Sequence, residues 1–471
     1  MMSPGQHRRN GDDHQPAAAV SAAMLADLYE ITMAAAYHVS GIGHEASFEL
    51  TVRSLPVQRR FLVAAGLDAA LAGLEDFRFG DDDLAYLGSL GIMPAGFLDV
   101  LADLRFTGEV WAIPEGELVF AGEPLLRVTA PLLEAQLAET FLLNQVASQT
   151  MVASKAARVA LACDGRAFVD FSARRDHGVD AAMTAARSGW LAGSSGTSLV
   201  AAGQRWGIPV SGTMAHSFVM AFDDERDAFR AYAQAFPERA VLLLDTYDTV
   251  VGAHHAVEVA GDLAPEGIAI AGVRLDSGDL AALSVVVRRI LDAGGLGDTQ
   301  VLASGDLDEH RIAHLVAQGA AIDAFGVGTQ LGTSADAPSL GAVYKLVEDA
   351  DGPKMKLAVG KVTLPGRKQV WRAEDHDVVG LHDEVVDGAR PLLVKVMADG
   401  QRLPAGREPL ATARERCRAR LATLPEALRS LAPTGGETPW PVELSDGLRA
   451  MAAEVRAHLV AVGNGNGAEP T

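Results

Sequence analysis

The amino-acid sequence predicts an α/β protein. It indicates an irregular, about seven-stranded α/β barrel of the TIM type beside a discontinuous α/β sandwich domain built from N- and C-terminal segments. Two observations support this. From about residue 165 to residue 344, short apolar segments alternate with helical spans, and a polar or glycine-rich cluster follows each apolar segment. On both sides of this region, strand-like segments alternate with Gly and Pro turns. Strands that alternate with helices imply right-handed βαβ units and a parallel sheet.

Length and composition limit the class of protein. The chain has 471 residues, enough for two or three domains with a large core. Hydrophobic residues make up 49% and charged residues 21%, as is usual for globular proteins. The net charge of −21 argues against nucleic acid or an anionic membrane as a partner. A local cluster of Arg side chains and backbone amides could still bind an anion.

The cysteines and the N-terminus indicate a compartment. Cys163 and Cys417 are the only two cysteines and lie far apart, which argues against a disulfide framework and a Cys-based zinc site. Residues 1–16 are polar and lack the apolar core of a secretory signal. No segment approaches the roughly 18–20 apolar residues that a membrane span requires. We therefore expect a cytoplasmic protein.

The N-terminal third reads as mixed helices and strands. Residues 1–19 are expected to be disordered, and residues 21–37 to form a helix with Leu28 and Ile31 on one face and Tyr29 to its side. A strand, a helix, a set of short antiparallel strands and a long helix are then expected over residues 46–52, 61–74, 106–128 and 132–162.

Two groups of basic residues stand in this third. Arg59 and Arg60 lie in a loop after Pro56, where a solvated loop and an anion-binding role are equally good interpretations. Lys155 and Arg158 lie on one side of the long helix, and we interpret them as a solvated face.

The middle of the chain contains seven apolar segments, each followed by a polar cluster. Seven units fit an irregular or incomplete barrel better than the regular eightfold one, and the clusters would gather on the face at the carboxyl ends of the strands. The seven segments are residues 167–171, 190–193, 208–210, 241–244, 268–275, 301–304 and 322–327.

Strand-like segments return after Gly328 and are expected to rejoin the N-terminal sheet. They cover residues 341–348, 354–359 and 368–373, and two helices over 411–424 and 444–462 follow. The expected domains are therefore a sandwich of residues 20–150 with 345–462 and a barrel of residues 151–344, between disordered termini at 1–19 and 463–471.

Histidine 216 is a candidate functional residue. The segment Ile208–Val210 ends in SGTMAHS, which places Thr213 and His216 directly after a predicted strand. A histidine at a strand end can serve as nucleophile, base or phosphoryl carrier near neutral pH. A structural, hydrogen-bonded histidine is an equally good interpretation of the stretch alone.

Three further clusters could bind an anion. Arg174 and Arg175 offer planar guanidinium groups, although an ion-pair network explains them equally well. Asp276, which follows Arg274 at a strand end, suits magnesium-bound water or ribose hydroxyls, whereas Asp279 is better interpreted as a helix N-cap. A glycine-rich turn supplies backbone amides for a phosphate through Gly326, Gly328 and Thr329.

Taken together, these motifs resemble the nicotinate phosphoribosyltransferase family. The matching segments run in family order over about residues 25–375 and are most specific in SGTMAHSF and GVRLDSGDL. The others are DLYEITMAAAY, FSARR, LLDTYDT, IDAFGVGT, PSLGAVYKLV and LPGRKQVWR. The resemblance implies a type II phosphoribosyltransferase fold and a homodimer whose active sites use both subunits.

The resemblance also implies a reaction and its residues. Nicotinate and 5-phosphoribosyl 1-diphosphate would give nicotinate mononucleotide and pyrophosphate, a step of NAD biosynthesis, with ATP as co-substrate and Mg²⁺ bound through the diphosphate. His216 would become phosphorylated, and Arg274 and Asp276 would complete the catalytic set. Nicotinate contacts would come from Thr213, Arg274, Phe171 stacked on the pyridine ring, and Tyr29 of the neighbouring subunit.

The same resemblance assigns the groups that hold phosphoribosyl diphosphate. Asp276 would contact the ribose or magnesium, which makes it the one candidate protein contact of the metal, and the glycine-rich turn would hold the 5-phosphate. The full set is Arg174, Arg175, Asp276, Ser304, Gly305, Asp306, Gly326, Gly328 and Thr329.

Two departures from the family pattern lie beside the implied base pocket. Ser172 stands where Gly is common, Asp176 and His177 where Ala-Gln is common, and Leu199 where Asn is common. The sequence therefore leaves open nicotinamide or quinolinate as the base, although the cation of Arg274 favours an acid. A non-catalytic ligand-binding relative is a further alternative, against which intact His216 and Asp276 argue.

Overall fold

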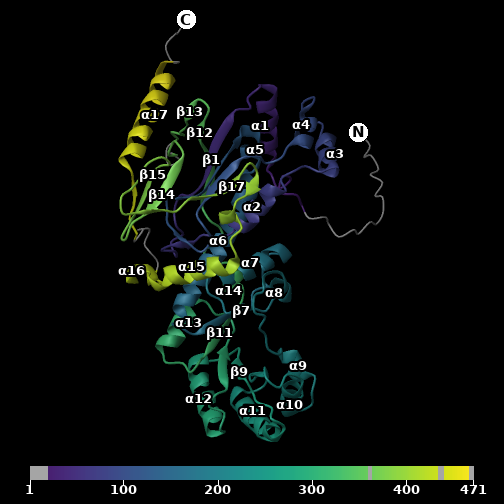
Figure 1. Ribbon diagram of the computed structural model, residues 1–471. Coiled ribbons are helices and arrows are strands. Elements are labelled where there is room, and N and C mark those ends of the chain that lie inside the picture. The colour runs from purple at the N-terminus through teal and green to yellow at the C-terminus, as the bar shows by residue number, and fades with distance from the viewer. Residues whose placement is uncertain (1–19, 359–362, 433–439, 466–471) are drawn as a thin grey trace, which may run out of the picture.

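The computed structural model describes residues 20–358, 363–432 and 440–465, and it shows a mixed α/β protein in two parts (Figure 1). The upper part in this view combines strands from both ends of the chain, and the lower part is a parallel sheet covered by helices. Helix α15 (Leu410–Ala422) crosses between them. The expected disorder of residues 1–19 and of residues 466–471 falls outside the described residues. Residues 463–465, expected in the same disordered tail, instead end helix α17.

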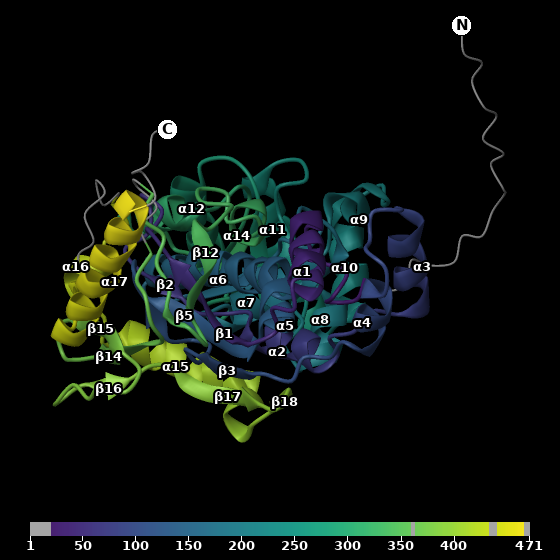
Figure 2. The same ribbon diagram turned by 90° about the horizontal axis from the view of Figure 1, so that it is seen from above.

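The upper part is built on a seven-stranded sheet in the order β13-β12-β1-β5-β3-β17-β18. Strand β1 pairs antiparallel with β5 on one side and with β12 on the other, so a C-terminal strand continues the N-terminal sheet. Strand β17 does the same beside β3. Figure 2 shows these strands side by side, with α17 at the margin. The N-terminal elements are α1 (Leu28–Val39), β1 (Glu45–Val52), β2 (Leu62–Val63), α2 (Leu67–Glu75), α3 (Asp81–Ser89), α4 (Phe97–Asp103), β3 (Glu109–Ala112), β4 (Leu118–Val119), β5 (Pro124–Pro131), α5 (Leu132–Leu137) and α6 (Glu139–Ala162).

The C-terminal segment also forms a smaller sheet in the order β16-β14-β15-β19, in which β15 and β19 run parallel. Its elements, with those that join the larger sheet, are β12 (Ala342–Asp349), β13 (Gly352–Pro353), β14 (Lys368–Arg372), β15 (Asp377–Leu381), β16 (Arg390–Pro391), β17 (Val394–Ala398), β18 (Gln401–Arg402), η2 (Pro404–Gly406), α15, α16 (Glu426–Arg429), β19 (Val442–Leu444) and α17 (Asp446–Gly465).

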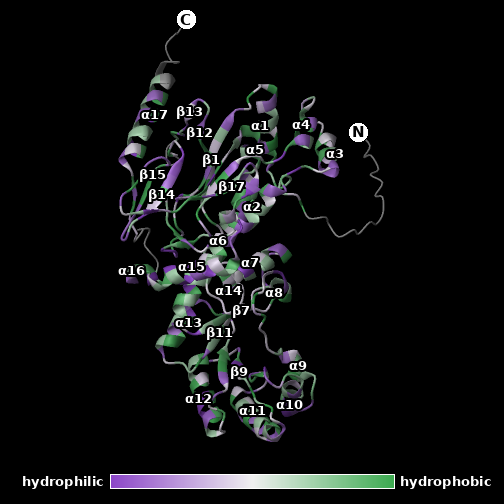
Figure 3. Cartoon of the chain, in the orientation of Figure 1, coloured by the Kyte–Doolittle hydropathy of each residue, from purple (hydrophilic) through white to green (hydrophobic). Residues whose placement is uncertain are grey.

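The lower part is a six-stranded parallel sheet in the order β7-β6-β11-β10-β9-β8. Helices between the strands bury one apolar face each. In α12 the buried positions 280, 284, 287 and 291 follow the helical repeat, and Figure 3 shows green and purple segments alternating along it. The elements are β6 (Ala167–Asp170), α7 (Val179–Leu191), β7 (Gly196–Thr197), α8 (Val200–Trp206), α9 (His216–Met220), α10 (Glu225–Ala235), β8 (Val241–Leu243), α11 (Thr249–Leu263), η1 (Ala264–Glu266), β9 (Gly272–Leu275), α12 (Leu280–Ala293), β10 (Gln300–Ala303), α13 (Glu309–Ala317), β11 (Ala324–Val327) and α14 (Thr329–Gly332).

The parallel sheet confirms an α/β fold, but the described residues contain no closed barrel. The segment Ile208–Val210 forms only an isolated bridge between Val210 and Thr197. Pro209 has no N–H to donate to a neighbouring strand, and Val210 is 48% exposed. No strand pairing therefore connects β7 to β8 within the described chain, and the sheet stays open.

Three element predictions were wrong. Residues 190–193, expected as a strand, include the end of α7, and the strand begins only at Gly196. Residues 61–74, expected as one helix, begin with strand β2. Residues 354–358 form no strand, and residue 359 lies outside the described range. In the first two cases a short apolar run fits a helix and a strand equally well, and tertiary contacts decide.

The interpretation of Lys155 and Arg158 as a solvated face was wrong as well. Both side chains are buried in the middle of α6, where they meet the buried carboxylate of Glu309 from α13; the Arg158 Nε atom lies 2.9 Å from Glu309 Oε1. Lys155 Nζ also lies 2.9 Å from Asp336 Oδ1. Arg59 is fully buried and paired with Asp336, so its guanidinium is neither solvated nor free to bind an anion. These ion pairs connect the upper and lower parts through α6.

None of the helices in the described ranges is both long enough and apolar enough to cross a membrane.

We predict that Lys155→Met lowers the free energy of unfolding by about 3–5 kcal/mol, because it leaves the buried Glu309 carboxylate with only one cationic partner. The matched control is Lys354→Met. Lys354 pairs with Asp349 at the surface and is 35% exposed, so its loss is expected to cost about 0–1 kcal/mol. Urea unfolding of both variants measures the difference. Equal losses for the two would contradict a buried network.

Candidate functional site

The candidate site lies at the carboxyl ends of the parallel strands. Because the strands of one parallel sheet point the same way, the residues that follow them meet at one edge. In the β9–β10 pair, Arg274 lies opposite Leu302 and Leu275 opposite Ala303. This register places Asp276, the next residue after β9, beside Ser304, the next residue after β10.

The Arg274 guanidinium connects three of the predicted site residues. Its Nε atom donates to Ser304 Oγ (2.7 Å), its Nη1 atom to Thr213 Oγ1 (3.0 Å) and its Nη2 atom to Asp276 Oδ1 (2.6 Å). Ser304 Oγ also donates to Asp276 Oδ1. The Arg274 side chain is only 13% exposed, so this cluster is held in place before any ligand binds.

These contacts set the charge of Asp276. Burial raises the pKa of its carboxyl, but the hydrogen bond from Ser304 and the charge of Arg274 outweigh burial and lower the pKa below its ordinary value. Asp276 is therefore a carboxylate at neutral pH, ready to face a cation or a developing positive charge.

His216 faces the same carboxylate. It is the first residue of α9, and its Nε2 atom lies 3.9 Å from Asp276 Oδ2. On its other side, Nδ1 lies 3.2 Å from Thr246 Oγ1. The side chain of His216 is 42% exposed, so a ligand can reach the ring. A histidine with a purely structural role would usually be buried.

Asp245 and Thr246 belong to this edge but were not among the predicted site residues. Asp245 Oδ2 accepts from the Asp276 backbone N–H (3.2 Å) and from Ser277 Oγ (2.5 Å). The signal was present in the sequence, because the segment DTYDT directly follows the apolar strand β8. The interpretation of Asp279 as an N-cap is confirmed, since its side chain accepts from Ala282 N (3.1 Å).

Phe171 forms one wall of the cluster. The Arg274 Cζ atom lies 5.6 Å from the centre of its ring, within the range of a cation–π contact. A Cβ atom at Gly326 would overlap the same ring, so glycine at this position of β11 makes room for Phe171. Glycine in the predicted glycine-rich turn is therefore required for packing, whether or not the turn binds a phosphate.

The turn after β10 lies against the turn after β9. Gly305 has φ of +93°, and a Cβ atom there would overlap the Asp276 carbonyl oxygen. Asp306 also has a positive φ, and its carbonyl oxygen accepts from Arg311 Nη1 (2.9 Å). Both residues lie at the strand edge, as expected, and Gly305 fits only because it lacks a side chain.

Several predicted anion-binding groups are open to solvent. Arg174 and Arg175 are exposed, and neither guanidinium has a partner among the described residues. The ion-pair network that was the alternative interpretation for them is therefore absent from the described chain. Gly328 and Thr329 begin α14, where Thr329 is exposed.

Tyr29 does not join the cluster. It lies on α1, at the opposite end of Figure 1 from α9, and is 46% exposed. Within a single chain the structure therefore brings together every predicted site region except this one.

The first of the two departures, at Ser172 and Asp176, lies in the loop that follows Phe171, and the second, at Leu199, lies just after β7. Ser172 Oγ donates to Asp176 Oδ2 (3.0 Å), and a side chain at Gly332 would overlap Asp176. Burial raises the pKa of Asp176 to about 6, against the opposing effect of the Ser172 hydrogen bond. Leu199 caps α8, and its backbone N–H donates to Thr197 Oγ1 (3.1 Å).

A buried carboxylate orients this loop. Asp170, the last residue of β6, accepts from the Ser172 N–H (2.9 Å) and from Thr197 Oγ1 (2.8 Å). It thereby ties the segment that carries Phe171 and the two arginines to the neighbouring strand β7. Nowhere in the described ranges are three His, Cys, Asp or Glu side chains grouped so that they could hold a metal ion.

Comparisons with known proteins agree on one family. The family model described as the nicotinate phosphoribosyltransferase (NAPRTase) N-terminal domain matches residues 24–147, and the model of the nicotinate phosphoribosyltransferase (NAPRTase) family matches residues 166–349. The chain is 47% identical over 439 residues to nicotinate phosphoribosyltransferase pncB2 of Mycobacterium tuberculosis, covering 92% of this chain and 94% of the relative. It is 47% identical over 388 residues to nicotinate phosphoribosyltransferase of Bacillus subtilis, covering 79% of each chain.

Solved structures show the same likeness. The crystal structure of human nicotinic acid phosphoribosyltransferase matches with a TM-score of 0.81 and 31% identity, over 91% of this chain and 99% of the human one. A nicotinate-nucleotide pyrophosphorylase from Pyrococcus furiosus, 24% identical with a TM-score of 0.71 over 85% of this chain and 95% of its own, shares the fold.

We predict that Ser304→Ala raises the pKa of Asp276, because the lost hydrogen bond favours the ionised carboxylate. Ser277→Ala is the matched control, since Ser277 lies at the same edge but donates to Asp245. Carbon-13 NMR titration of the carboxyl signals measures both. If the pKa of Asp276 stays constant or falls in Ser304→Ala, the assignment of this hydrogen bond is wrong.

Proposed function

The chain belongs to the nicotinate phosphoribosyltransferase family, and on that premise we propose that it joins nicotinate to 5-phosphoribosyl 1-diphosphate, giving nicotinate mononucleotide and pyrophosphate. One observation carries the proposal: Arg274 is held by Thr213, Ser304 and Asp276 at the strand edge, next to the ring of Phe171. A planar acid fits this combination of a fixed cation and an aromatic wall.

The base pocket would use the cation and the ring together. Nicotinate would stack on Phe171 and place its carboxylate against Arg274 and Thr213. Only three of the five guanidinium N–H groups of Arg274 are engaged within the described chain, so the group keeps donors for a ligand. Tyr29 would reach the same pocket from the neighbouring subunit of a homodimer, consistent with its exposure in the single chain.

The phosphoribosyl diphosphate would occupy the rest of the strand edge. Arg174 and Arg175 have unpaired guanidinium groups for its phosphates, and Gly326 to Thr329 offer close backbone approach for the 5-phosphate. Beside Asp276, the phosphoribosyl diphosphate would also contact Ser304, Gly305 and Asp306. The carboxylate of Asp276 is a suitable contact for the ribose or for Mg²⁺, which prefers one or two carboxylates together with substrate phosphates.

The chemistry makes few demands on the protein. The pyridine nitrogen attacks the anomeric carbon, the bond to the diphosphate breaks with its electron pair, and positive charge develops on the ribose. Bound magnesium would neutralise charge on the leaving diphosphate. Catalysis is then mainly electrostatic and positional, and the Asp276 carboxylate is placed to stabilise the ribose cation. No strong base is needed, because the ring nitrogen is already a nucleophile.

We further propose that ATP hydrolysis drives the reaction through a phosphohistidine at His216. The exposed ring lies next to the Asp276 carboxylate, so a phosphoryl group there would add negative charge beside the diphosphate site. That charge would change the affinity for substrate and product without entering the glycosidic step. The reaction would thus combine a glycosyl transfer with ligase-type use of ATP.

The remaining assignments rest on sequence. We retain a catalytic domain of residues 151–344 and a second domain of residues 20–150 with 345–462. We also retain a cytoplasmic location, with which the two buried, free cysteines agree. No nucleic acid or membrane partner is proposed.

Nicotinamide is the alternative base that the structure makes most testable. The half-buried Asp176, whose carboxyl pKa is raised to about 6, accepts a hydrogen bond from Ser172 in the loop after Phe171 and would disfavour a second carboxylate nearby. The fixed cation of Arg274 favours the acid, and we give it more weight because it contacts the pocket through three hydrogen bonds. Rates with nicotinate, nicotinamide and quinolinate, with and without ATP, decide among the bases. A higher rate with nicotinamide or quinolinate would contradict the proposed substrate.

We predict that Arg274→Gln raises the KM for nicotinate by about tenfold to a hundredfold, since a hydrogen bond to a charged group contributes about 1.5–3 kcal/mol. The preference for nicotinate over nicotinamide should fall by a similar factor. Arg274→Lys keeps the charge without the planar guanidinium, so its KM for nicotinate is expected to lie between those of the wild type and Arg274→Gln. Steady-state kinetics measure this, and an unchanged preference in Arg274→Gln would show that the guanidinium does not recognise the carboxylate.

We predict that His216→Ala abolishes acid-labile labelling by γ-labelled ATP and the stimulation of turnover by ATP, while thermal unfolding is unchanged. His254→Ala is the matched control, because His254 is exposed on helix α11, which begins four residues after Asp245, and is not among the proposed site residues. Full ATP-dependent turnover in His216→Ala would rule out the phosphohistidine, whereas loss of it in His254→Ala would show that the effect is not specific.

A further inference from the structure

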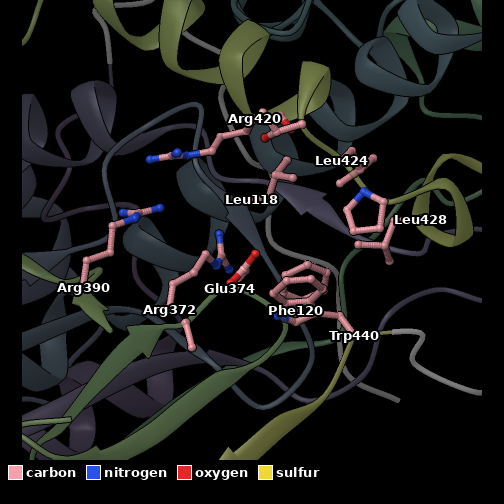
Figure 4. Close-up of a pocket in the computed structure, with 12 residues that line it drawn as sticks. Leu118, Phe120, Arg372, Glu374, Arg390, Arg420, Leu424, Leu428 and Trp440 are labelled. Carbon is pink, nitrogen blue, oxygen red and sulfur yellow. The ribbon is translucent and has the colours of Figure 1, made fainter. Parts of the chain in front are cut away.

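A second cavity lies in the upper part of the molecule, away from the strand-end site. It has a volume of about 240 Å³ and lies where β4, β14, β16, α15 and α16 meet (Figure 4). Figure 4 shows its two halves. Arginine side chains occupy one side, and leucines with Phe120 and Trp440 occupy the other. None of its lining residues belongs to the proposed catalytic machinery.

The polar half is organised by one buried carboxylate. Glu117 is 2% exposed and accepts from Arg372 Nη1 (3.1 Å), Arg390 Nη2 (2.8 Å) and Arg420 Nε (2.9 Å). Arg372 is the most engaged of the three arginines, because its Nε and Nη2 atoms also donate to Asp377 (2.9 and 2.6 Å). Arg390 and Arg420 each donate only to Glu117 within the described chain. They keep free N–H groups for an anion.

In the polar half of the cavity, the buried carboxylates do not balance the charges of the arginines. Glu117 and Asp377 are two buried carboxylates facing three arginines. Glu123 lies behind Phe120, and burial together with Asp377 raises its pKa well above the ordinary range, so it adds no negative charge. One guanidinium charge is therefore left without a buried partner. Among the described residues that line the cavity, the exposed Glu374 at the rim is the one opposing charge.

The apolar half offers a flat aromatic wall. The rings of Phe120 and Trp440 are stacked, with centroids 5.3 Å apart and planes 15° apart. Leu118, Leu424 and Leu428 complete this side. Trp440 is more than nine-tenths buried, and its Nε1 atom has no hydrogen-bond partner among the described residues. A buried donor without an acceptor is unfavourable.

We propose that this cavity binds a planar aromatic carboxylate of single-ring size. The flat ring would pack on the aromatic and leucine side, and the carboxylate would take the free N–H groups of Arg390 and Arg420. The volume is below the roughly 300–1,000 Å³ typical of sites for drug-sized ligands and suits a ligand of one ring. Nicotinate belongs to this ligand class, but the site does not depend on the proposed reaction.

The experiment follows the indole signal of Trp440 in the full chain by nitrogen-15 NMR, with benzoate as the probe because it has no ring nitrogen to react. The chain has five tryptophans, and Trp440→Phe identifies the signal. Benzoate is expected to shift it in a saturable way. Arg390→Gln and Arg420→Gln should each weaken binding by about tenfold, since each removes a charge-assisted hydrogen bond. Arg390→Gln is expected to fold, because Glu117 keeps two cationic partners.

Matched controls locate the effect. Arg418 lies on α15, the helix of Arg420, is 78% exposed and pairs with Glu415, so Arg418→Gln should leave benzoate binding unchanged. Glu374→Gln removes the opposing charge and should strengthen binding. Benzyl alcohol, which lacks the charge, and cyclohexanecarboxylate, which lacks the flat ring, should each bind more weakly than benzoate. Arg274→Gln should not alter the titration.

Three results would overturn the proposal. The first is a Trp440 signal that does not move at millimolar benzoate. The second is a shift that persists at full affinity in both Arg390→Gln and Arg420→Gln or that cyclohexanecarboxylate produces equally well. The third is a shift that Arg274→Gln abolishes, because benzoate would then act from the strand-end site.

Discussion

The hydrogen bonds of Arg274 are the interaction on which the site depends. A single guanidinium holds the residue after β10, the residue after β9 and Thr213 at once. It can do so only because β9 and β10 are parallel and in register, which places Ser304 and Asp276 side by side. The small residues Gly305 and Gly326 then allow the turns and the Phe171 ring to approach. The proposed recognition of a planar acid and the charge of Asp276 both follow from this arrangement.

The two parts of the molecule are connected by buried ion pairs rather than by a continuous sheet. Lys155 and Arg158 of α6 meet Glu309 of α13, and Lys155 and Arg59 share Asp336. Groups of this kind stabilise little in net terms but are costly to break singly, so they fix one arrangement of the two parts. Buried ion pairs also hold the second cavity together, since Glu117 pairs with three arginines from separate segments.

The sequence predicts local order better than long-range partners. Alternation of apolar segments and helices was enough to indicate a parallel sheet and to place His216, Asp276, Ser304 and Gly328 at its edge. It could not show that Lys155 is buried, because the partner Glu309 lies far along the chain and residue type alone does not reveal burial. The predicted irregular barrel does not close among the described residues for a local reason, since Pro209 and the short apolar segment around it form only one bridge. Tyr29 remains outside the cluster, because one chain cannot show what a second subunit would contribute.

The most direct test of the account is a crystal structure of the protein with nicotinate mononucleotide. We expect the pyridine ring to lie on Phe171, the carboxylate on Arg274 and Thr213, and the 5-phosphate near Gly326 to Thr329. A nucleotide bound elsewhere, or one whose carboxylate points away from Arg274, would contradict the claim that this strand edge recognises the acid.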